Sequence, residues 1–198
     1  MRIKDRVKPK APPVAPGVYM AICVGVIDLG EQYSDRFKSY SNKVLFVFEL
    51  FGEHITVDGK QQPRQLSREF TISASKKGAL RPFLENWNGE SYSDDAFGEL
   101  DLFAQIGKPC QIQVALNETK EYANVTNVMQ VPKGYTLPEA ESTPILWDME
   151  DWNEQAFQDL PAWAKEKIQK STQYQKDHVP TDAVTVSPTG GAKEENPI

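Results

Sequence analysis

The sequence predicts a mainly β protein: a five-stranded barrel with a helical insertion between its third and fourth strands, followed by a C-terminal helix and a disordered tail. Three observations support this fold class. Two apolar segments near the N-terminus, residues 18–27 and 43–52, have the composition of strands. The segments of the body follow the order of three strands, a helical region and two strands. Polar sequence with proline or glycine flanks that body at both ends.

Length and composition fit one globular domain with appendages. The chain has 198 residues, 39% of them hydrophobic and 10% aromatic, which is enough apolar material for a single core. We divide it into a basic arm (1–16), a barrel domain (17–132), a linker with a helical segment (133–172) and an acidic tail (173–198). No apolar run reaches the roughly 20 residues of a membrane span, and the charged N-terminus lacks the apolar region of a signal peptide. We therefore expect a cytoplasmic protein without a membrane partner.

The net charge of −6 is unevenly distributed along the chain. Residues 1–133 contain 17 Lys and Arg against 16 Asp and Glu, a net of +1, whereas residues 134–198 contain 5 against 12, a net of −7. The predicted barrel is thus near neutral and can hold a locally basic groove. Five basic residues and four prolines in residues 1–16 predict a mobile arm, which is either a supplementary phosphate contact or a solubilising leader.

The first strand is expected at Gly17–Ile27, where side chains alternate between two faces. Gly30 then opens a loop, Glu31–Asn42, and the second strand follows at Lys43–Gly52. The remaining elements of the body are a turn at Asp58-Gly59, a third strand (67–74), a helix (79–87) with Pro82 in its first turn, a second helix (94–106) ended by Gly107, a fourth strand (108–116), a tight connection (117–121) and a fifth strand (122–131).

This order of elements matches the OB-fold, a five-stranded Greek-key barrel in which two loops flank the oligonucleotide-binding face. Those loops join strands one and two and strands four and five. Here they correspond to residues 31–42 and 117–121. The fold geometry therefore predicts that these two loops border a binding groove.

Beyond a linker between Pro132 and Pro138, residues 145–152 form an acidic and aromatic patch. Apolar spacing predicts an amphipathic helix at Gln155–Ser171, either continuous or divided at Pro161. From Gln173 onward the polar composition predicts disorder.

The loop between the first two strands interleaves aromatic rings with cations, a composition suited to stacking bases and holding phosphates. The alternative is a loop that packs its own rings. The predicted main nucleic-acid contacts are Tyr33, Arg36, Phe37, Lys38, Tyr40 and Lys43, supported by Arg68, Lys76, Lys77, Lys120 and Tyr122.

Several segments resemble phage-encoded single-stranded DNA-binding proteins of the OB-fold kind. They are Pro16-Gly-Val-Tyr, the aliphatic and aromatic second strand, Lys108-Pro-Cys-Gln-Ile-Gln-Val and Tyr122-Ala-Asn-Val, so the resemblance covers residues 16–132. Leu160-Pro-Ala-Trp, with Ile168 and Ser171, is similar to a stretch of phage proteins of this type. The resemblance implies sequence-tolerant binding of single-stranded DNA during phage replication or recombination in a bacterial host cell. It leaves open whether the protein is a monomer or a homodimer.

The C-terminal Glu-Glu-Asn-Pro-Ile resembles the acidic tips with which bacterial single-stranded DNA-binding proteins recruit replication and repair partners, although Ile stands where that family has Phe. The tip is either such a recruiting segment or a frayed terminus. The acidic tail could also compete with DNA for the groove. The predicted partner-binding residues are Trp147, Trp152, Trp163, Glu194, Glu195, Pro197 and Ile198.

The sequence predicts no catalytic, metal or cofactor site. His54 and His178 are too few and too distant in sequence for a zinc site or a triad, and neither Cys23 nor Cys110 belongs to a CxxC motif. Both cysteines fall in apolar strand patterns, so we expect buried free thiols. Two other functions stay open: a protein-interaction adaptor that docks through residues 147–163, and a virion structural protein that uses the barrel as a scaffold.

Overall fold

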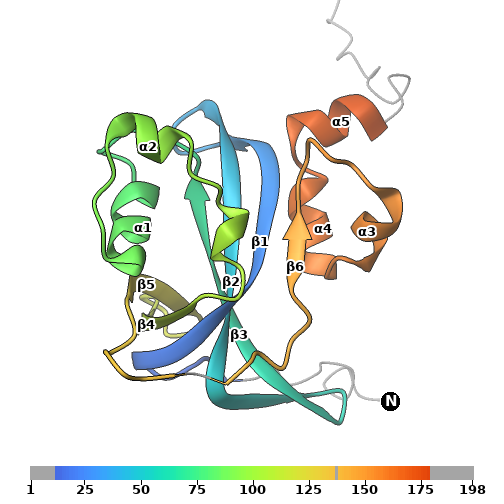
Figure 1. Cartoon of the computed structure of the whole chain (residues 1–198). Helices are drawn as coiled ribbons and strands as arrows, with labels where there is room; N and C mark the ends of the chain where they lie inside the picture. Colours follow the sequence, from blue (N-terminus) through green and yellow to red (C-terminus); the bar gives the residue numbers. More distant parts are fainter. Residues whose placement is uncertain (1–11, 137, 179–198) are drawn as a thin grey trace, which may run out of the picture.

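The computed structural model describes residues 12–136 and 138–178. Its centre is a six-stranded, mainly antiparallel sheet with helices on both sides (Figure 1). The strands are β1 (Gly17–Ser34), β2 (Ser39–Val57), β3 (Lys60–Thr71), β4 (Pro109–Leu116), β5 (Ala123–Met129) and β6 (Ile145–Trp147). Pairing follows the order β3-β2-β1-β4-β5, and β6 pairs in parallel with β1. The mainly β prediction is confirmed. Strand pairing among the described residues does not close the sheet, so a barrel is not confirmed.

The long strand β1 joins two parts of the sheet. Its first part, from Gly17 to Ile22, pairs with β4, and its later residues 25–27 pair with β6. Register shifts at Cys23/Gly25 and Asp28/Gly30 interrupt its ladder with β2. Such bulges bend a strand and increase its twist, which allows successive parts of β1 to pair with β4 and with β6 along the same edge.

Most of the loop predicted at residues 31–42 is strand, because β1 continues to Ser34 and β2 begins at Ser39. Tyr33 lies opposite Tyr40 and Ser34 opposite Ser39, so only residues 35–38 form the turn. The predicted turn at Asp58-Gly59 is confirmed between β2 and β3, and both residues have positive φ (50° and 80°) as a two-residue hairpin turn requires. Strand β3 begins and ends earlier than expected because residues 60–66 extend that hairpin.

The helical insertion comprises α1 (Leu80–Asn88), α2 (Asp94–Gly98) and a short 3-10 helix (Phe103–Gln105). The helix predicted at residues 79–87 is confirmed, but the continuous helix predicted at 94–106 is wrong. Helix α2 ends at Gly98, a poor helix former, and the Asp101 carboxylate accepts the Phe103 N–H at the start of the 3-10 turn (2.9 Å). The apolar side of α1 covers one face of the sheet. It buries Leu80, Phe83, Leu84 and Trp87 against Phe46, Phe48 and Phe70.

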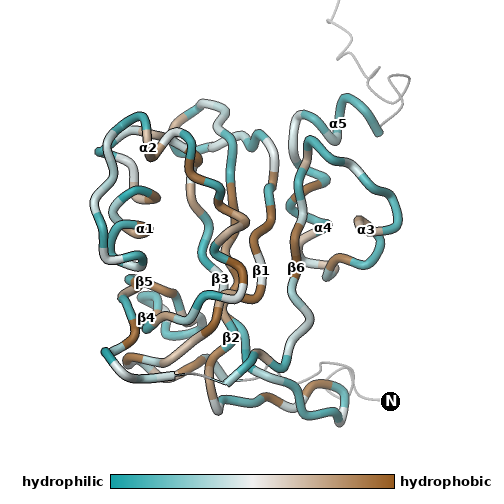
Figure 2. The backbone as a smooth tube through the Cα atoms, in the orientation of Figure 1, coloured by the Kyte–Doolittle hydropathy of each residue, from teal (hydrophilic) through white to brown (hydrophobic). Residues whose placement is uncertain are grey.

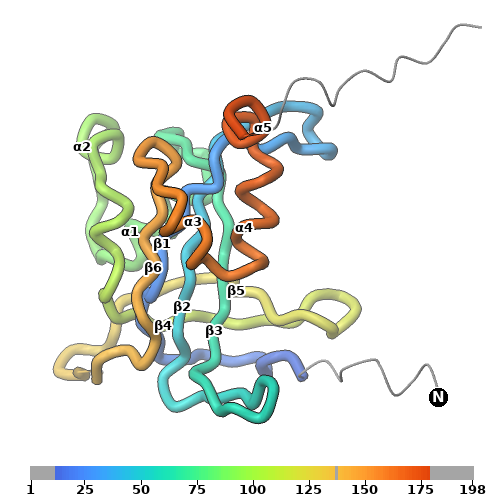
Figure 3. Tube along the Cα trace, turned by 90° about the vertical axis from the view of Figure 1, so that its right-hand side faces the viewer, coloured from blue at the N-terminus to red at the C-terminus, as the bar shows by residue number. Residues whose placement is uncertain are grey.

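The C-terminal segment covers the opposite face with α3 (Glu154–Asp159), α4 (Ala162–Ile168) and α5 (Thr172–His178) (Figure 3). The predicted helix is thus divided at Pro161, and the disorder predicted from Gln173 is wrong as far as His178. Side chains of β1 and β2 form a second core with the C-terminal segment: Ile22, Val24, Ile27, Leu29, Leu45 and Val47 meet Trp147, Phe157, Leu160, Ala164 and Ile168. The residues of β1 and β6 are mainly hydrophobic, whereas those of α5 are hydrophilic (Figure 2).

Both cysteines are free and buried, as predicted. Burial raises the pKa of the Cys23 thiol to about 12 and that of Cys110 well above its usual value. Part of the predicted mobile arm also belongs to the folded body, because Val14 is buried in the first core. Residues 1–11 of the arm lie outside the described residues.

Candidate nucleic-acid interface

The hairpin tip, which we define as residues 33–40 at the end of β1 and β2, presents three aromatic rings to solvent. Cross-strand pairing brings Tyr33 and Tyr40 together, with ring centroids 5.0 Å apart and a tilt of 55°. Tyr33 is 48% exposed, Phe37 70% and Tyr40 57%. Aromatic side chains normally bury most of their area, so three exposed rings on one hairpin form a surface available for stacking.

Cations lie beside these rings. The Arg36 guanidinium is 5.3 Å from the centroid of the Phe37 ring. Lys38, at a φ of 51°, forms an exposed ion pair of 3.7 Å with Asp35. A surface pair of this kind contributes little to stability and exchanges readily for another anion. Lys43, nearer the sheet, donates from Nζ to the Thr71 hydroxyl (2.7 Å). The structure therefore groups all six predicted main contacts on one hairpin.

The predicted supporting residues fall in three different places. Arg68 lies between β3 and β5, where its guanidinium donates to the Thr126 carbonyl oxygen (2.6 Å) and sits over the rings of Phe70 and Phe83 (4.7 and 5.2 Å). Burial lowers its pKa from the ordinary value. Because these contacts use the Arg68 head group to join two strands, we assign it a packing role.

Lys76 and Lys77 follow β3 at the hairpin end of the sheet, since Thr71 lies opposite Lys43. Lys76 forms an ion pair with Asp94 (3.2 Å). Lys120 and Tyr122 belong to the connection between β4 and β5, beside the start of β1, and therefore lie at a different end of the sheet from the hairpin tip (Figure 3).

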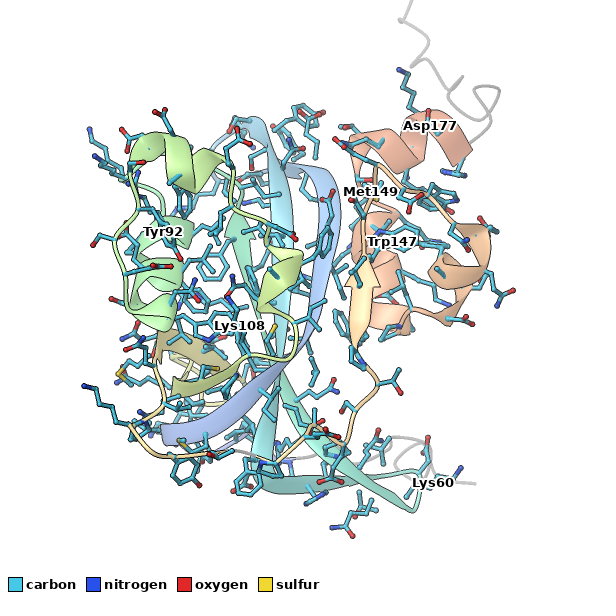
Figure 4. The ribbon with its side chains drawn as sticks, viewed as in Figure 1. Lys60, Tyr92, Lys108, Trp147, Met149 and Asp177 are labelled. Atoms are coloured by element: carbon cyan, nitrogen blue, oxygen red, sulfur yellow. The ribbon has the colours of Figure 1, made fainter. Side chains whose placement is uncertain are left out.

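The three tryptophans predicted to bind partners have different surroundings. Trp147 is 2% exposed and lies between β1 and the C-terminal helices, so its side chain is not accessible to a partner (Figure 4). Trp152 packs within 6 Å of Trp147, Phe157, Tyr174 and His178 by ring centroid. Only Trp163 is substantially exposed. The predicted docking patch is therefore largely a core. Glu194, Glu195, Pro197 and Ile198 lie outside the described residues.

A pocket of about 300 Å³ lies at the base of the hairpin, and sequence reasoning missed it. We call it the base pocket. It is lined from β1 by Gln32 and Tyr33, from β2 and β3 by Lys43 and Glu69, and from the end of α4 and the following turn by Lys167 and Lys170. The spacing of Lys167 and Lys170 places both on one side of a helical segment, which was the only available signal.

Comparisons with protein-family models and with curated proteins find no match for this chain. Within the described residues, no group of three His, Cys, Asp or Glu side chains is placed to hold a metal ion. None of the helices in that part of the chain is long and apolar enough to cross a membrane.

Proposed function

We propose that this protein binds single-stranded DNA with little sequence preference and that the hairpin tip is its main contact surface. The exposed Tyr33–Tyr40 pair, with Phe37 and the neighbouring cations, is the observation that supports this proposal most strongly. Stacking a base on an aromatic side chain contributes roughly 1–3 kcal/mol and tolerates every base, because each base has a π face. The cations add a salt-dependent attraction for the phosphates.

The strand order supports an OB-type barrel that is open between β3 and β5. Pairing of β1 with both β2 and β4 leaves β3 and β5 as the two ends of the order. The hydrogen bond from Arg68 of β3 to Thr126 of β5 joins those ends. In an OB-fold the loop between the first two strands borders the nucleic-acid face, which is the position of the hairpin tip.

The biological setting of the proposal rests on the resemblance to phage single-stranded DNA-binding proteins. In this proposal the protein is non-enzymatic and coats exposed strands in the bacterial host cytoplasm during phage replication or recombination. The acidic C-terminal tip, with Glu194, Glu195, Pro197 and Ile198, would recruit replication or recombination partners.

The experiment is a fluorescence-anisotropy titration of labelled oligo-dT at 50 and 200 mM salt. The wild-type protein should bind saturably and more weakly at the higher salt. The double variant Tyr33→Ala/Tyr40→Ala should bind at least about 30-fold more weakly, because two stacking contacts of at least ~1 kcal/mol each are lost. Tyr135→Ala is the matched control, since it removes an exposed ring outside the hairpin tip. Absence of saturable binding by the wild type, or equal binding by the double variant, would contradict the proposal.

A protein-docking function is the second candidate. It is favoured by Leu146 and Trp163, two large apolar side chains of the C-terminal segment that remain exposed. Absence of oligo-dT binding by the wild-type protein at both salt concentrations would favour this docking function instead.

A further inference from the structure

We propose that the base pocket holds a backbone phosphate of the bound strand, with Lys43, Lys167 and Lys170 as its cationic ligands. The inference rests on the proposed function and names a subsite within it. It adds the end of α4 to the nucleic-acid interface, a region for which the sequence predicted an amphipathic helix but no nucleic-acid contact.

The charges around the base pocket favour an anion. Three lysines line it, against one carboxylate, that of Glu69. Glu69 accepts from Lys167 Nζ at 2.5 Å and so neutralises one of the three. Within the described residues, Lys43 Nζ donates to the neutral Thr71 hydroxyl, and no carboxylate forms an ion pair with Lys43 or Lys170. In that part of the chain, two of the positive charges that line this concave site are therefore not neutralised.

Hydrogen bonds hold the end of α4 and the start of α5 against β1 of the hairpin. We call this hydrogen-bonded junction the frame of the base pocket, because it positions Lys167 and Lys170 before a ligand binds. Gln32 Nε2 donates to the carbonyl oxygens of Leu29 (2.7 Å) and Lys167 (3.0 Å). The Glu31 N–H donates to the Gln173 side-chain oxygen (2.9 Å), and the Thr172 hydroxyl donates to the Glu31 carboxylate (2.8 Å). A frame that is already ordered reduces the entropy lost when a ligand binds.

Tyr33 links the pocket to the stacking surface. Its side chain lines the base pocket, and its ring contacts that of Tyr40 on the hairpin tip. A nucleotide whose base stacks on these rings would therefore have a phosphate within reach of the pocket. This geometry suits a single strand, in which bases are free to leave the stack while the backbone follows the protein surface.

The test compares two charge-neutralising variants of the full chain by oligo-dT titration. Lys170→Gln should bind about fivefold more weakly at 0.1 M salt, and the slope of log K against log salt should fall by about 0.7, the contribution of one phosphate contact on a single strand. Lys60→Gln is the control, because it makes the same charge change at the exposed β2–β3 turn (Figure 4). The β2–β3 ladder places that turn at the opposite end from Lys43 and the base pocket. The smaller effect of Lys60→Gln should reflect net charge alone.

Two further arms test the chemistry. Glu69→Gln removes the one carboxylate that the described residues contribute to the pocket lining and releases Lys167, so it should tighten binding. An oligo-dT with uncharged methylphosphonate linkages should bind the wild type and Lys170→Gln equally, because the phosphate charge is missing. Titration with inorganic phosphate, read out by competition with labelled oligo-dT, distinguishes a site for a free anion from one that requires the strand.

The outcomes separate the two proposals. Equal losses for Lys170→Gln and Lys60→Gln, in a protein whose Tyr33→Ala/Tyr40→Ala variant is impaired, would overturn the phosphate site and leave the hairpin-tip function standing. A wild-type protein that does not bind oligo-dT would overturn both.

Discussion

Substituting Gly30 tests whether the C-terminal helices pack against the hairpin as the structure requires. Gly30 has a φ of +67°, and an added Cβ would lie 2.8 Å from the Gln173 side-chain oxygen and 2.9 Å from the Ser171 Cβ. Gln173 can move aside, but Ser171 is fully buried and cannot. A left-handed backbone costs a residue with a Cβ ~1–2 kcal/mol, and overpacking adds ~1–3 kcal/mol. Gly30→Ala should therefore lower the free energy of unfolding by about 2–5 kcal/mol.

Gly52→Ala is the matched control for the backbone cost. Gly52 has a similar φ of +75°, and an added Cβ would meet nothing within 4 Å. Gly52→Ala should therefore lower the free energy of unfolding by only ~1–2 kcal/mol. Both values can be measured by urea denaturation followed through the fluorescence of the Trp147–Trp152 cluster. Equal losses for the two variants would show that the junction of α4 and α5 does not pack on Gly30, and would refute the frame proposed for the base pocket.

Three further predictions concern other parts of the molecule. Trp147→Ala should lower the free energy of unfolding by ~3–5 kcal/mol in the same assay, and Trp163→Ala by much less, because only the former empties a buried site. Arg68→Gln should lower the free energy of unfolding by ~1–3 kcal/mol, because the hydrogen bond between β3 and β5 is lost. It should leave the salt dependence of oligo-dT binding unchanged, and a shallower slope of log K against log salt would show that Arg68 is a phosphate contact. Cys23 and Cys110 should resist thiol reagents at pH 8 until denaturant is added. Since burial raises the pKa of Cys23 from 9.0 to about 12, the unfolded thiol ionises first, so the contribution of this thiol to stability should be intact below pH 9 and be lost as the pH rises toward 12.

The strands were predictable where one or both faces are buried. Residues 44–48 form an unbroken apolar run, and the structure buries all five. Val44, Phe46 and Phe48 lie on one face, and Leu45 and Val47 on the other. Such a run is itself typical of a strand covered on both sides. The apolar run therefore indicated that a layer covers each face of the sheet. The helical periodicity of residues 155–171 predicted helices there, but periodicity alone does not show which surface those helices cover.

The extension of the hairpin to residues 33–40 was not predictable from hydrophobic periodicity, because both of its faces are exposed and no apolar pattern distinguishes it from a loop. Its aromatic and cationic composition nevertheless led to the nucleic-acid contacts predicted there, and those contacts stay a prediction. The base pocket was beyond sequence reasoning for a different reason. Lys43 and Lys170 are far apart in the chain, and only the docking of α4 on β1 brings them together.

The most direct measurement of the central claim is photo-cross-linking of saturating oligo-dT to the full chain, followed by mass spectrometry of the attached peptides. We expect the cross-links to concentrate on the peptide that contains Tyr33, Phe37 and Tyr40, and to decrease when salt is raised. Cross-links confined to the β4–β5 connection at Lys120 and Tyr122, with the hairpin tip unmodified under saturation, would contradict the account.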